Sequence, residues 1–184
     1  MVNSILAPVQ ELEPTVGDEF QGVFENAAAA AHATLLLRLQ LLKDEKVDSR
    51  YGLGFGGLTV FEERTPLSQD GPAWWAARAA IDRVGQLADG HMGFARTWFE
   101  WGEPDTEPPA EARSLNSFLI CRDALIEQMR PRHRRLLLGL LLQRPQAELA
   151  LEEGISQPAV SQGLARSGAY AVRAAEYELS GVLG

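Results

Sequence analysis

The sequence predicts an α+β protein, with a sheet and helices in residues 1–101 and an all-helical domain in residues 113–184. Three observations lead to this division. Short runs rich in β-branched and aromatic residues, with turn residues between them, occur before residue 101. Residues 113–184 carry apolar residues at spacings of three and four, which is typical of packed helices. Between them, residues 102–112 (GEPDTEPPAEA) combine three prolines with four acids, a composition that favours an extended linker.

The composition is that of a folded protein, because 46% of the 184 residues are hydrophobic. The charge is divided unevenly along the chain. Residues 1–112 hold 8 Lys and Arg against 18 Asp and Glu, a net charge of −10, whereas residues 113–184 hold 9 against 7, a net charge of +2. The formal charge of −8 argues against a protein that coats nucleic acid non-specifically, and the C-terminal segment is the better candidate for contact with a polyanion.

The sequence argues against disulfides, a cysteine-based metal site and a membrane-targeting segment. The single cysteine, Cys121, excludes an internal disulfide framework and a cysteine-based zinc site. The first residues have neither the basic start nor the long apolar run of a signal peptide, and the longest apolar runs are far shorter than a membrane span. We therefore expect a cytoplasmic protein of the bacterial type that has no membrane partner.

The N-terminal half begins with a predicted hairpin and a long helix. Residues 13–25 (EPTVGDEFQGVFE) predict a β-hairpin because β-forming residues flank a Gly-Asp turn. Asn26 is then expected to cap a helix over residues 27–43, whose Ala and Leu residues have high helix propensity.

Residues 48–60 (DSRYGLGFGGLTV) predict a strand that contains four glycines. A phosphate-binding loop would place its glycines between a strand and an immediately following helix, but here strand residues follow them. We expect instead that another backbone or a ligand approaches the sheet closely at these positions, which are Gly52, Gly54, Gly56 and Gly57.

A helix is expected from Pro72 to about residue 87, because proline is well suited to the first turn. Its predicted buried face comprises Trp74, Trp75, Ala77 and Ile81. The aromatic run over residues 94–101 predicts the last strand.

Beyond the linker, helix is expected from about residue 114, with a break at Pro131 before a further helix over residues 133–142. Arginines cluster at that break, either as a solvated face or as phosphate contacts, and the sequence leaves both interpretations open. They are Arg130, Arg132, Arg134 and Arg135.

Residues 146–164 (QAELALEEGISQPAVSQGL) predict two short helices joined by a tight turn, which is the pattern of a helix-turn-helix. Ala150 is small where the two helices must pass closely, and Gly154 reaches the left-handed conformation that ends the first helix. Ser156 is suited to cap the second helix, and Pro158 falls in its first turn. Three apolar residues are expected to face the interior of this unit: Ile155, Val160 and Leu164.

The outer face of the second helix is the predicted DNA-binding surface. Such motifs insert this face into the major groove, where a glutamine can pair with adenine N6 and N7. The predicted contact residues are Ser156, Gln157, Ser161, Gln162 and Arg166. Because cations are few on this face, a plain two-helix corner and a scaffold for dimerisation remain as alternatives.

Three segments in this order resemble the SatD family, bacterial proteins with a C-terminal helix-turn-helix: VGDEFQG at 16–22, RYGLGFGGLTV at 50–60 and DGPAWWAARAAI at 70–81. The resemblance covers nearly the whole chain. More remotely, the same segments resemble the catalytic core of class III nucleotide cyclases and of GGDEF-type cyclases. That resemblance implies a ferredoxin-like α+β sheet in the N-terminal domain.

In those cyclases two carboxylates hold two Mg²⁺ ions, and an Asn and an Arg on one helix stabilise the developing charge. The resemblance implies that Asp18 is the metal-binding carboxylate of the hairpin and that Arg78 is the nucleotide-binding arginine. Trp74 stands at the position of the Asn, and Val16 replaces the first glycine of the GGDEF pattern. The first strand with its aspartate has no counterpart, which implies a partial sheet, truncated at its N-terminus or with a native start further upstream. A domain with these departures is expected to have no catalytic residues and no activity.

The sequence therefore predicts a DNA-binding regulatory protein of the SatD type, whose N-terminal domain senses a nucleotide or a partner without catalysis or a cofactor. Two alternatives stay open. One is a nucleotide-binding protein or nucleotidyl cyclase that uses Mg²⁺ with ATP or GTP, and the other is an interaction module that forms a homodimer through its terminal helices.

Overall fold

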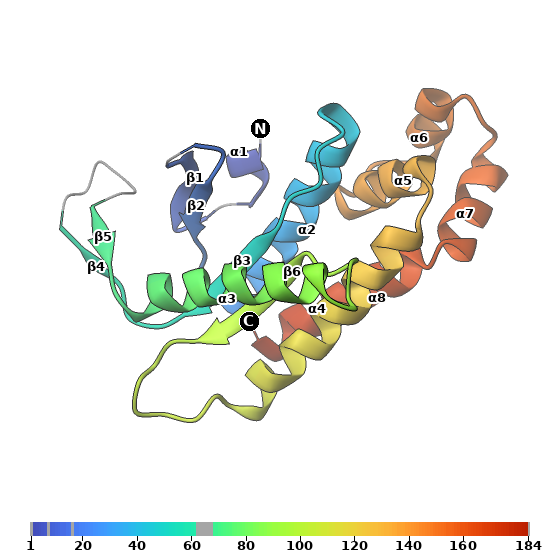
Figure 1. Ribbon diagram of the computed structural model, residues 1–184. Helices are drawn as coiled ribbons and strands as arrows, with labels where there is room; N and C mark the ends of the chain where they lie inside the picture. The colour runs from blue at the N-terminus through green and yellow to red at the C-terminus, as the bar shows by residue number, and fades with distance from the viewer. Residues whose placement is uncertain (1, 7, 16, 62–67, 184) are drawn as a thin grey trace.

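The computed structural model describes residues 2–6, 8–15, 17–61 and 68–183, which form a mixed α/β structure that is mostly helical (Figure 1). Its strands pair as three two-stranded sheets, β1 with β2, β3 with β6 and β4 with β5. The elements in chain order are α1 Val2–Leu6, β1 Gln10–Pro14, β2 Phe20–Val23, α2 Ala27–Asp44, β3 Tyr51–Phe55, β4 Thr59–Val60, β5 Gln69–Asp70, α3 Pro72–Asp89, β6 Thr97–Trp101, α4 Ala110–Gln128, α5 Pro131–Leu141, α6 Gln146–Glu153, α7 Gln157–Arg166 and α8 Ala169–Leu183.

The first two predicted elements are confirmed. Strands β1 and β2 form an antiparallel hairpin that begins at Gln10, three residues before the predicted start. Val16, which the prediction placed before the turn, lies outside the described residues. Helix α2 follows Asn26, whose side-chain oxygen accepts a hydrogen bond from the backbone N–H of Ala29 at 2.8 Å. The capping side chain thus ends the hairpin and starts the helix.

Strands β3 and β6 are parallel neighbours, and α3 covers one face of the pair. The predicted strand over residues 48–60 is divided, because its last residues pair with β5 as the separate strand β4. A Cβ atom added to Gly52 would lie 2.2 Å from the carbonyl oxygen of Ala77, and one added to Gly54 would lie 2.1 Å from that of Ala73. The predicted close approach of a backbone is therefore confirmed at these glycines, whereas Gly57 has open space around it.

The predicted buried face of α3 is wrong for Trp75, whereas its other members, Trp74, Ala77 and Ile81, are partly buried. Trp75 is 62% exposed, and its indole N–H donates to the carboxylate of Asp70 at 2.7 Å. Trp74 is partly buried and donates to the side chain of Gln69. The helix packs so closely on the strands that small residues fill the contact, and both tryptophans lie at its first turn beside β5. The buried residues of α3 are Ala76, Ala80 and Val84.

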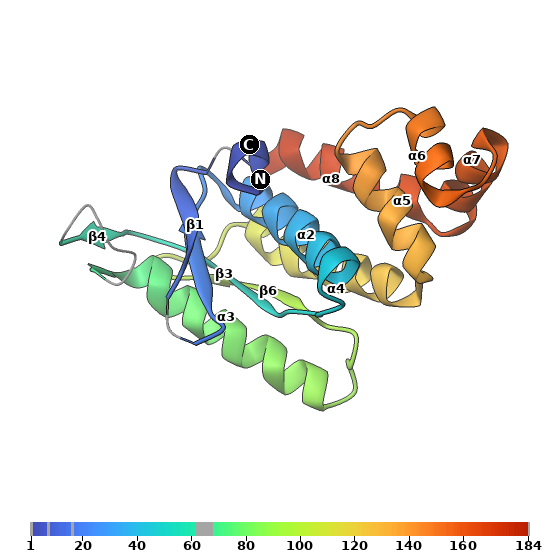
Figure 2. The same cartoon turned by 90° about the horizontal axis from the view of Figure 1, so that it is seen from above.

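The C-terminal helices share a hydrophobic core with α2. Leu35 and Leu39 of α2 belong to the same buried cluster as Leu137 of α5 and Leu164 of α7. Figure 2 shows α2 lying between the β3–β6 pair and the helices α5 and α8. Helix α4 begins at Ala110, inside the predicted linker, and Pro131 starts α5 as the predicted break requires. The division into two domains at 102–112 stays a prediction, and across it the core is continuous through α2.

A second buried cluster joins the other side of α2 to the β3–β6 pair and to α4, and it includes Ala31, Leu53, Phe99 and Leu119. Helices α2 and α4 therefore contribute to both cores, α4 through Leu119 in this cluster and Ile126 in the first. Among the described residues, no helix is both long enough and apolar enough to cross a membrane.

Candidate functional site

Helices α6 and α7 meet at a tight turn whose geometry follows from its residues. Gly154 has φ 64° and ψ 38°, in the left-handed region that glycine reaches without a Cβ penalty. The N–H of Ile155 donates to the carbonyl of Ala150 at 3.0 Å, which satisfies a free carbonyl at the end of α6. Ser156 then accepts a hydrogen bond from the N–H of Ala159 and caps α7. These residues end α6 and start α7 within three positions.

The inner face of this unit is packed against α5. Val160 and Leu164 are fully buried, and Ile155 packs against the same cluster. On α5, Gly139 makes room for α6, because a Cβ atom there would lie 2.4 Å from a methyl group of Leu149. The predicted interior residues are confirmed, and the orientation of α7 is fixed by this packing.

All five predicted DNA-contact residues are exposed. Ser156 and Gln157 lie at the start of α7, and Arg166 is its last residue. Ser161 and Gln162 are exposed and lie between Val160 and Leu164, which are four positions apart and share the buried face of α7. The structure brings these residues together on one exposed helix, and their contact with DNA stays a prediction.

The arginine cluster before α7 is largely neutralised by carboxylates. The Nε and Nη2 atoms of Arg135 donate to the two carboxylate oxygens of Glu153, at 2.6 and 2.7 Å, and Arg132 lies 3.6 Å from the same carboxylate. Arg134 donates to backbone carbonyls at the end of α4 and lies 3.8 Å from Glu127. The sequence left a solvated face and phosphate contact open, and the structure adds ion pairing within the chain.

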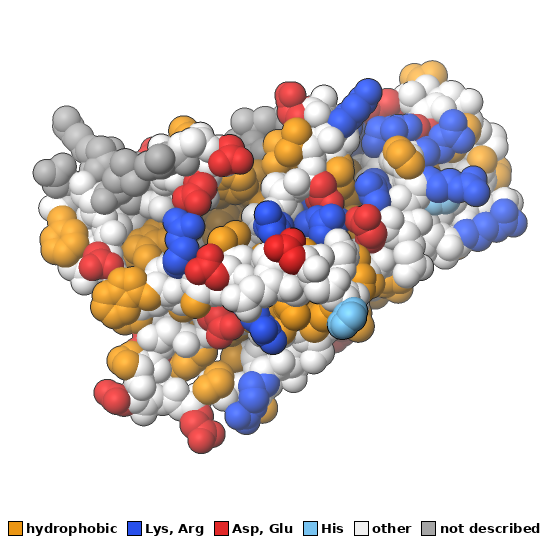
Figure 3. Space-filling view, viewed as in Figure 1, with side chains coloured by type: hydrophobic (Ala, Val, Ile, Leu, Met, Phe, Trp, Pro, Cys, Tyr) orange, Lys and Arg blue, Asp and Glu red, His pale blue; other side chains and the backbone are white. Residues whose placement is uncertain are grey.

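Arg144 is paired in the same way, with Glu152 at 2.7 Å and Glu148 at 3.7 Å. Around α6 and α7, the arginines that form no ion pair with a described residue are Arg130, Arg166 and Arg173. Figure 3 shows Lys and Arg side chains gathered over the end of the molecule that α5, α6 and α7 form. This end is rich in guanidinium groups, although many of them are already engaged.

The Glu153 pair predicts a pH-dependent contribution to stability. The hydrogen bonds from Arg135 hold the pKa of Glu153 below its ordinary value. Because the folded-state pKa is the lower one, the pair stabilises the fold above the pKa of the unfolded chain, about 4.3. That contribution disappears as the pH falls through the folded-state pKa. We expect Glu153→Gln to melt at a lower temperature than the wild type at neutral pH, and this difference to shrink progressively as the pH falls below about 4.3. Thermal denaturation of both proteins over a series of pH values checks this, and a difference that does not shrink in acid would contradict it.

The hairpin turn that carries Asp18 lies against α3. The two terminal nitrogens of Arg78 donate to the two carboxylate oxygens of Glu19, both at 3.1 Å, and this contact holds the pKa of Glu19 below its ordinary value. Asp18, the adjacent residue, is exposed. The sequence-predicted pair is thus brought to one region, but the guanidinium group is engaged by Glu19.

The metal and nucleotide assignments gain no further support from the geometry. Among the described residues, no three His, Cys, Asp or Glu side chains are grouped as metal ligands. Trp74, at the position of the cyclase Asn, donates to Gln69. The roles of Asp18 and Arg78 stay predictions.

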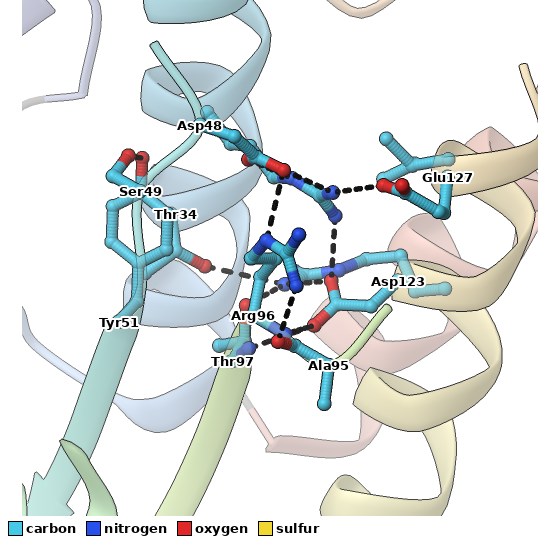
Figure 4. A network of polar contacts seen from close by, with 12 residues as sticks. Thr34, Asp48, Ser49, Tyr51, Ala95, Arg96, Thr97, Asp123 and Glu127 are labelled. Atoms are coloured by element: carbon cyan, nitrogen blue, oxygen red, sulfur yellow. Dashed lines mark hydrogen bonds and ion pairs between the residues drawn. The ribbon is translucent and has the colours of Figure 1, made fainter. Parts of the chain in front are cut away.

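Sequence reasoning missed a buried polar network at the centre of the molecule (Figure 4). Asp123 of α4 is completely buried, and one of its oxygens accepts the backbone N–H groups of Arg96 and Thr97 at 2.8 and 2.7 Å. Its other oxygen lies 3.4 Å from the guanidinium groups of Arg38 and Arg122. One carboxylate thereby holds the start of β6 and two buried arginines.

Both arginines extend this network to other elements. Arg38 of α2 also donates to Asp48 at 2.8 Å and to Glu127 at 3.2 Å. Arg122 of α4 donates to the carbonyl of Ala31 and lies 3.5 Å from Glu176 of α8. Its Nε atom is buried and has no hydrogen-bond partner among the residues that the structure describes. A signal was present in the sequence, because Arg38 stands between leucines on both sides, within LLLRL at 35–39. The network joins α2, α4, β6 and α8, and its role is structural.

Comparison with known proteins bears on the whole chain. A search of curated proteins and a search of solved structures each found no match. A family model described as the SatD family matches residues 8–170. This match extends from before β1 into α8 and therefore includes the hairpin, the β3–β6 pair and the α6–α7 unit. The chain belongs to the SatD family.

Proposed function

We propose that this chain is a DNA-binding regulatory protein in which α6, the turn and α7 form a helix-turn-helix. The observation that carries the proposal is the turn itself. A left-handed Gly154, a capped α7 and a buried row of Val160 and Leu164 leave the polar face of α7 exposed. A recognition helix needs such a face for the edges of bases in the major groove.

The N-terminal part has a sensory or interaction role in this proposal. Its β1–β2 hairpin and its β3–α3–β6 unit are interpreted as a partial ferredoxin-like, cyclase-like sheet without catalytic competence. Two contacts support a lack of catalysis, because Arg78 is engaged by Glu19 and Trp74 by Gln69. DNA is the expected partner, and a homodimer would match the two-fold symmetry of a palindromic site.

Substitutions at the two glutamines of α7 test sequence-specific binding. The preferred duplex is first selected from a random library, with DNA upstream of the gene as the starting candidate. We expect Gln157→Ala and Gln162→Ala each to weaken binding to that duplex by about tenfold or more, because a specific base contact contributes about 1–3 kcal/mol and each 1.4 kcal/mol is about tenfold. Binding to random DNA should change little, because backbone contacts carry it.

Fluorescence anisotropy titrations at one fixed salt concentration measure both affinities. Gln86→Ala is the matched control, since Gln86 is an exposed glutamine on α3. An equal loss on preferred and random duplexes would argue that these glutamines do not read sequence.

One observation favours a second candidate function. The Glu19–Arg78 contact places the hairpin turn beside α3, and that juxtaposition is required for a nucleotide site formed by Asp18 and Arg78. Mg²⁺ would be its metal. Turnover of ATP or GTP with Mg²⁺ tests this function, and activity that is unchanged in Asp18→Ala would dismiss the proposed site.

A further inference from the structure

We infer that Glu153 is an intramolecular competitor of DNA, which binds Arg135, lies in ion-pair contact with Arg132 and so lowers the affinity of the chain for the phosphate backbone. This inference rests on the proposed DNA-binding function. It concerns a contact between α5 and α6 that the predicted DNA-contact residues do not include.

The position of Glu153 places this contact at the edge of the predicted interface. Glu153 is the last residue of α6, directly before Gly154, and three positions before the cap of α7. Helix α5 lies alongside α7, because a Cβ atom on Gly163 would be 3.4 Å from Leu136 and 3.6 Å from His133. The arginines on α5 are therefore carried by a helix in direct contact with the recognition helix.

The exposure of the three side chains is unequal. The Glu153 carboxylate is only 8% exposed, whereas the side chains of Arg135 and Arg132 are 37% and 53% exposed. Glu153 is thus held in place, while both guanidinium groups reach solvent. A phosphate that approaches α7 would meet one guanidinium edge of Arg135 already bonded to Glu153, and Arg132 within 3.6 Å of the same carboxylate.

A carboxylate and a phosphate compete for the same guanidinium hydrogen-bond donors. Arg135 uses the edge of its planar guanidinium group that carries Nε and Nη2 on Glu153, at 2.6 and 2.7 Å, and a bidentate phosphate contact can use the same edge. Sequence-independent DNA affinity grows with the number of phosphates that are neutralised, and each contact makes the affinity more salt-dependent. Holding two arginines away from phosphate therefore reduces both quantities.

The test compares the wild type with Glu153→Gln on one random duplex between about 50 and 200 mM salt. Each added phosphate contact changes the slope of log affinity against log salt by about −0.9. We expect the slope for Glu153→Gln to be steeper by about 1 to 2. The loss of affinity across that salt range should be larger by about 3- to 12-fold, and binding at the low-salt end should be tighter than in the wild type.

Two further variants separate competition from other causes. Glu103→Gln removes one negative charge from the loop before α4, at the opposite end of a 19-residue helix from α5. An equal gain in this control would reduce the effect to bulk charge and overturn the inference. Arg135→Gln should leave the wild-type slope unchanged, and adding it to Glu153→Gln should cancel most of the gain. A smaller slope in Arg135→Gln alone would show that Arg135 already contacts phosphate, which also overturns the inference.

The outcomes distinguish this inference from the proposed function. If the wild type binds DNA and Glu153→Gln binds no more tightly, with an unchanged slope, only the competitor role fails. If neither protein binds at the lowest salt concentration, the proposed function fails and the inference falls with it. Circular dichroism of each variant confirms that the helices are intact, and Arg135→Gln provides the test even if Glu153→Gln does not fold.

Discussion

Replacing Gly54 by alanine is expected to lower the free energy of unfolding by about 3 kcal/mol or more, because the added methyl group meets backbone and not a flexible side chain. The new Cβ atom would lie 2.1 Å from the carbonyl oxygen of Ala73 and 2.3 Å from the backbone nitrogen of Ala77. These atoms belong to α3, so the helix would have to move away from β3. The same movement would separate α3 from β6, since the helix contacts both strands.

Urea denaturation followed by circular dichroism measures this loss, and Gly57→Ala is its matched control. Gly57 lies three residues further along the same segment, and a Cβ atom there has nothing within 4 Å. We expect Gly57→Ala to change the free energy of unfolding by no more than about 0.5 kcal/mol. Similar losses in the two variants would mean that α3 does not lie as close to β3 as the glycines indicate.

The sequence was sufficient to predict those elements whose ends are set by residues within a few positions of one another. Asn26 caps α2 through its own side chain, and Gly154 ends α6 because its backbone adopts a conformation that other residues avoid. The glycines of β3 also predicted a close backbone approach. What they did not reveal was the consequence for α3, where small residues fill the interface and Trp75 is left on the surface.

Contacts between residues far apart in the sequence were beyond such reasoning. Arg135 and Glu153 are 18 positions apart, and Arg38 and Asp123 are 85 apart. Each pair forms only because packing brings two helices together, and no local pattern specifies that partner. For the candidate interface, the sequence therefore predicted the exposed residues of α7 but not the carboxylates that limit the charge around them. The charge count of residues 113–184 had suggested a more available basic surface than the ion pairs leave.

Replacing Asp123 by alanine is expected to cost about 3–5 kcal/mol of unfolding free energy, because it leaves the charges of Arg38 and Arg122 buried with fewer partners. Both arginines have side chains that are 1% exposed, so water cannot take the place of the carboxylate. The backbone N–H groups of Arg96 and Thr97 would also lose their acceptor at the start of β6. An unsatisfied buried donor adds its own penalty to that of the unpaired charges.

The loss is expected to appear throughout the molecule and not in one half, since α2 and α4, which the network joins, also contribute to both buried clusters. Chemical denaturation read at the helical signal and at the fluorescence of the tryptophans in α3 and β6 should shift together. Asp105→Ala, at an exposed position in the loop before α4, controls for the loss of one aspartate and should shift neither signal. If Asp123→Ala moved only the tryptophan signal, the buried network would belong to the β3–β6 region alone. The α6–α7 unit would then be stable without it, and the division predicted at residues 102–112 would describe two independent folding units.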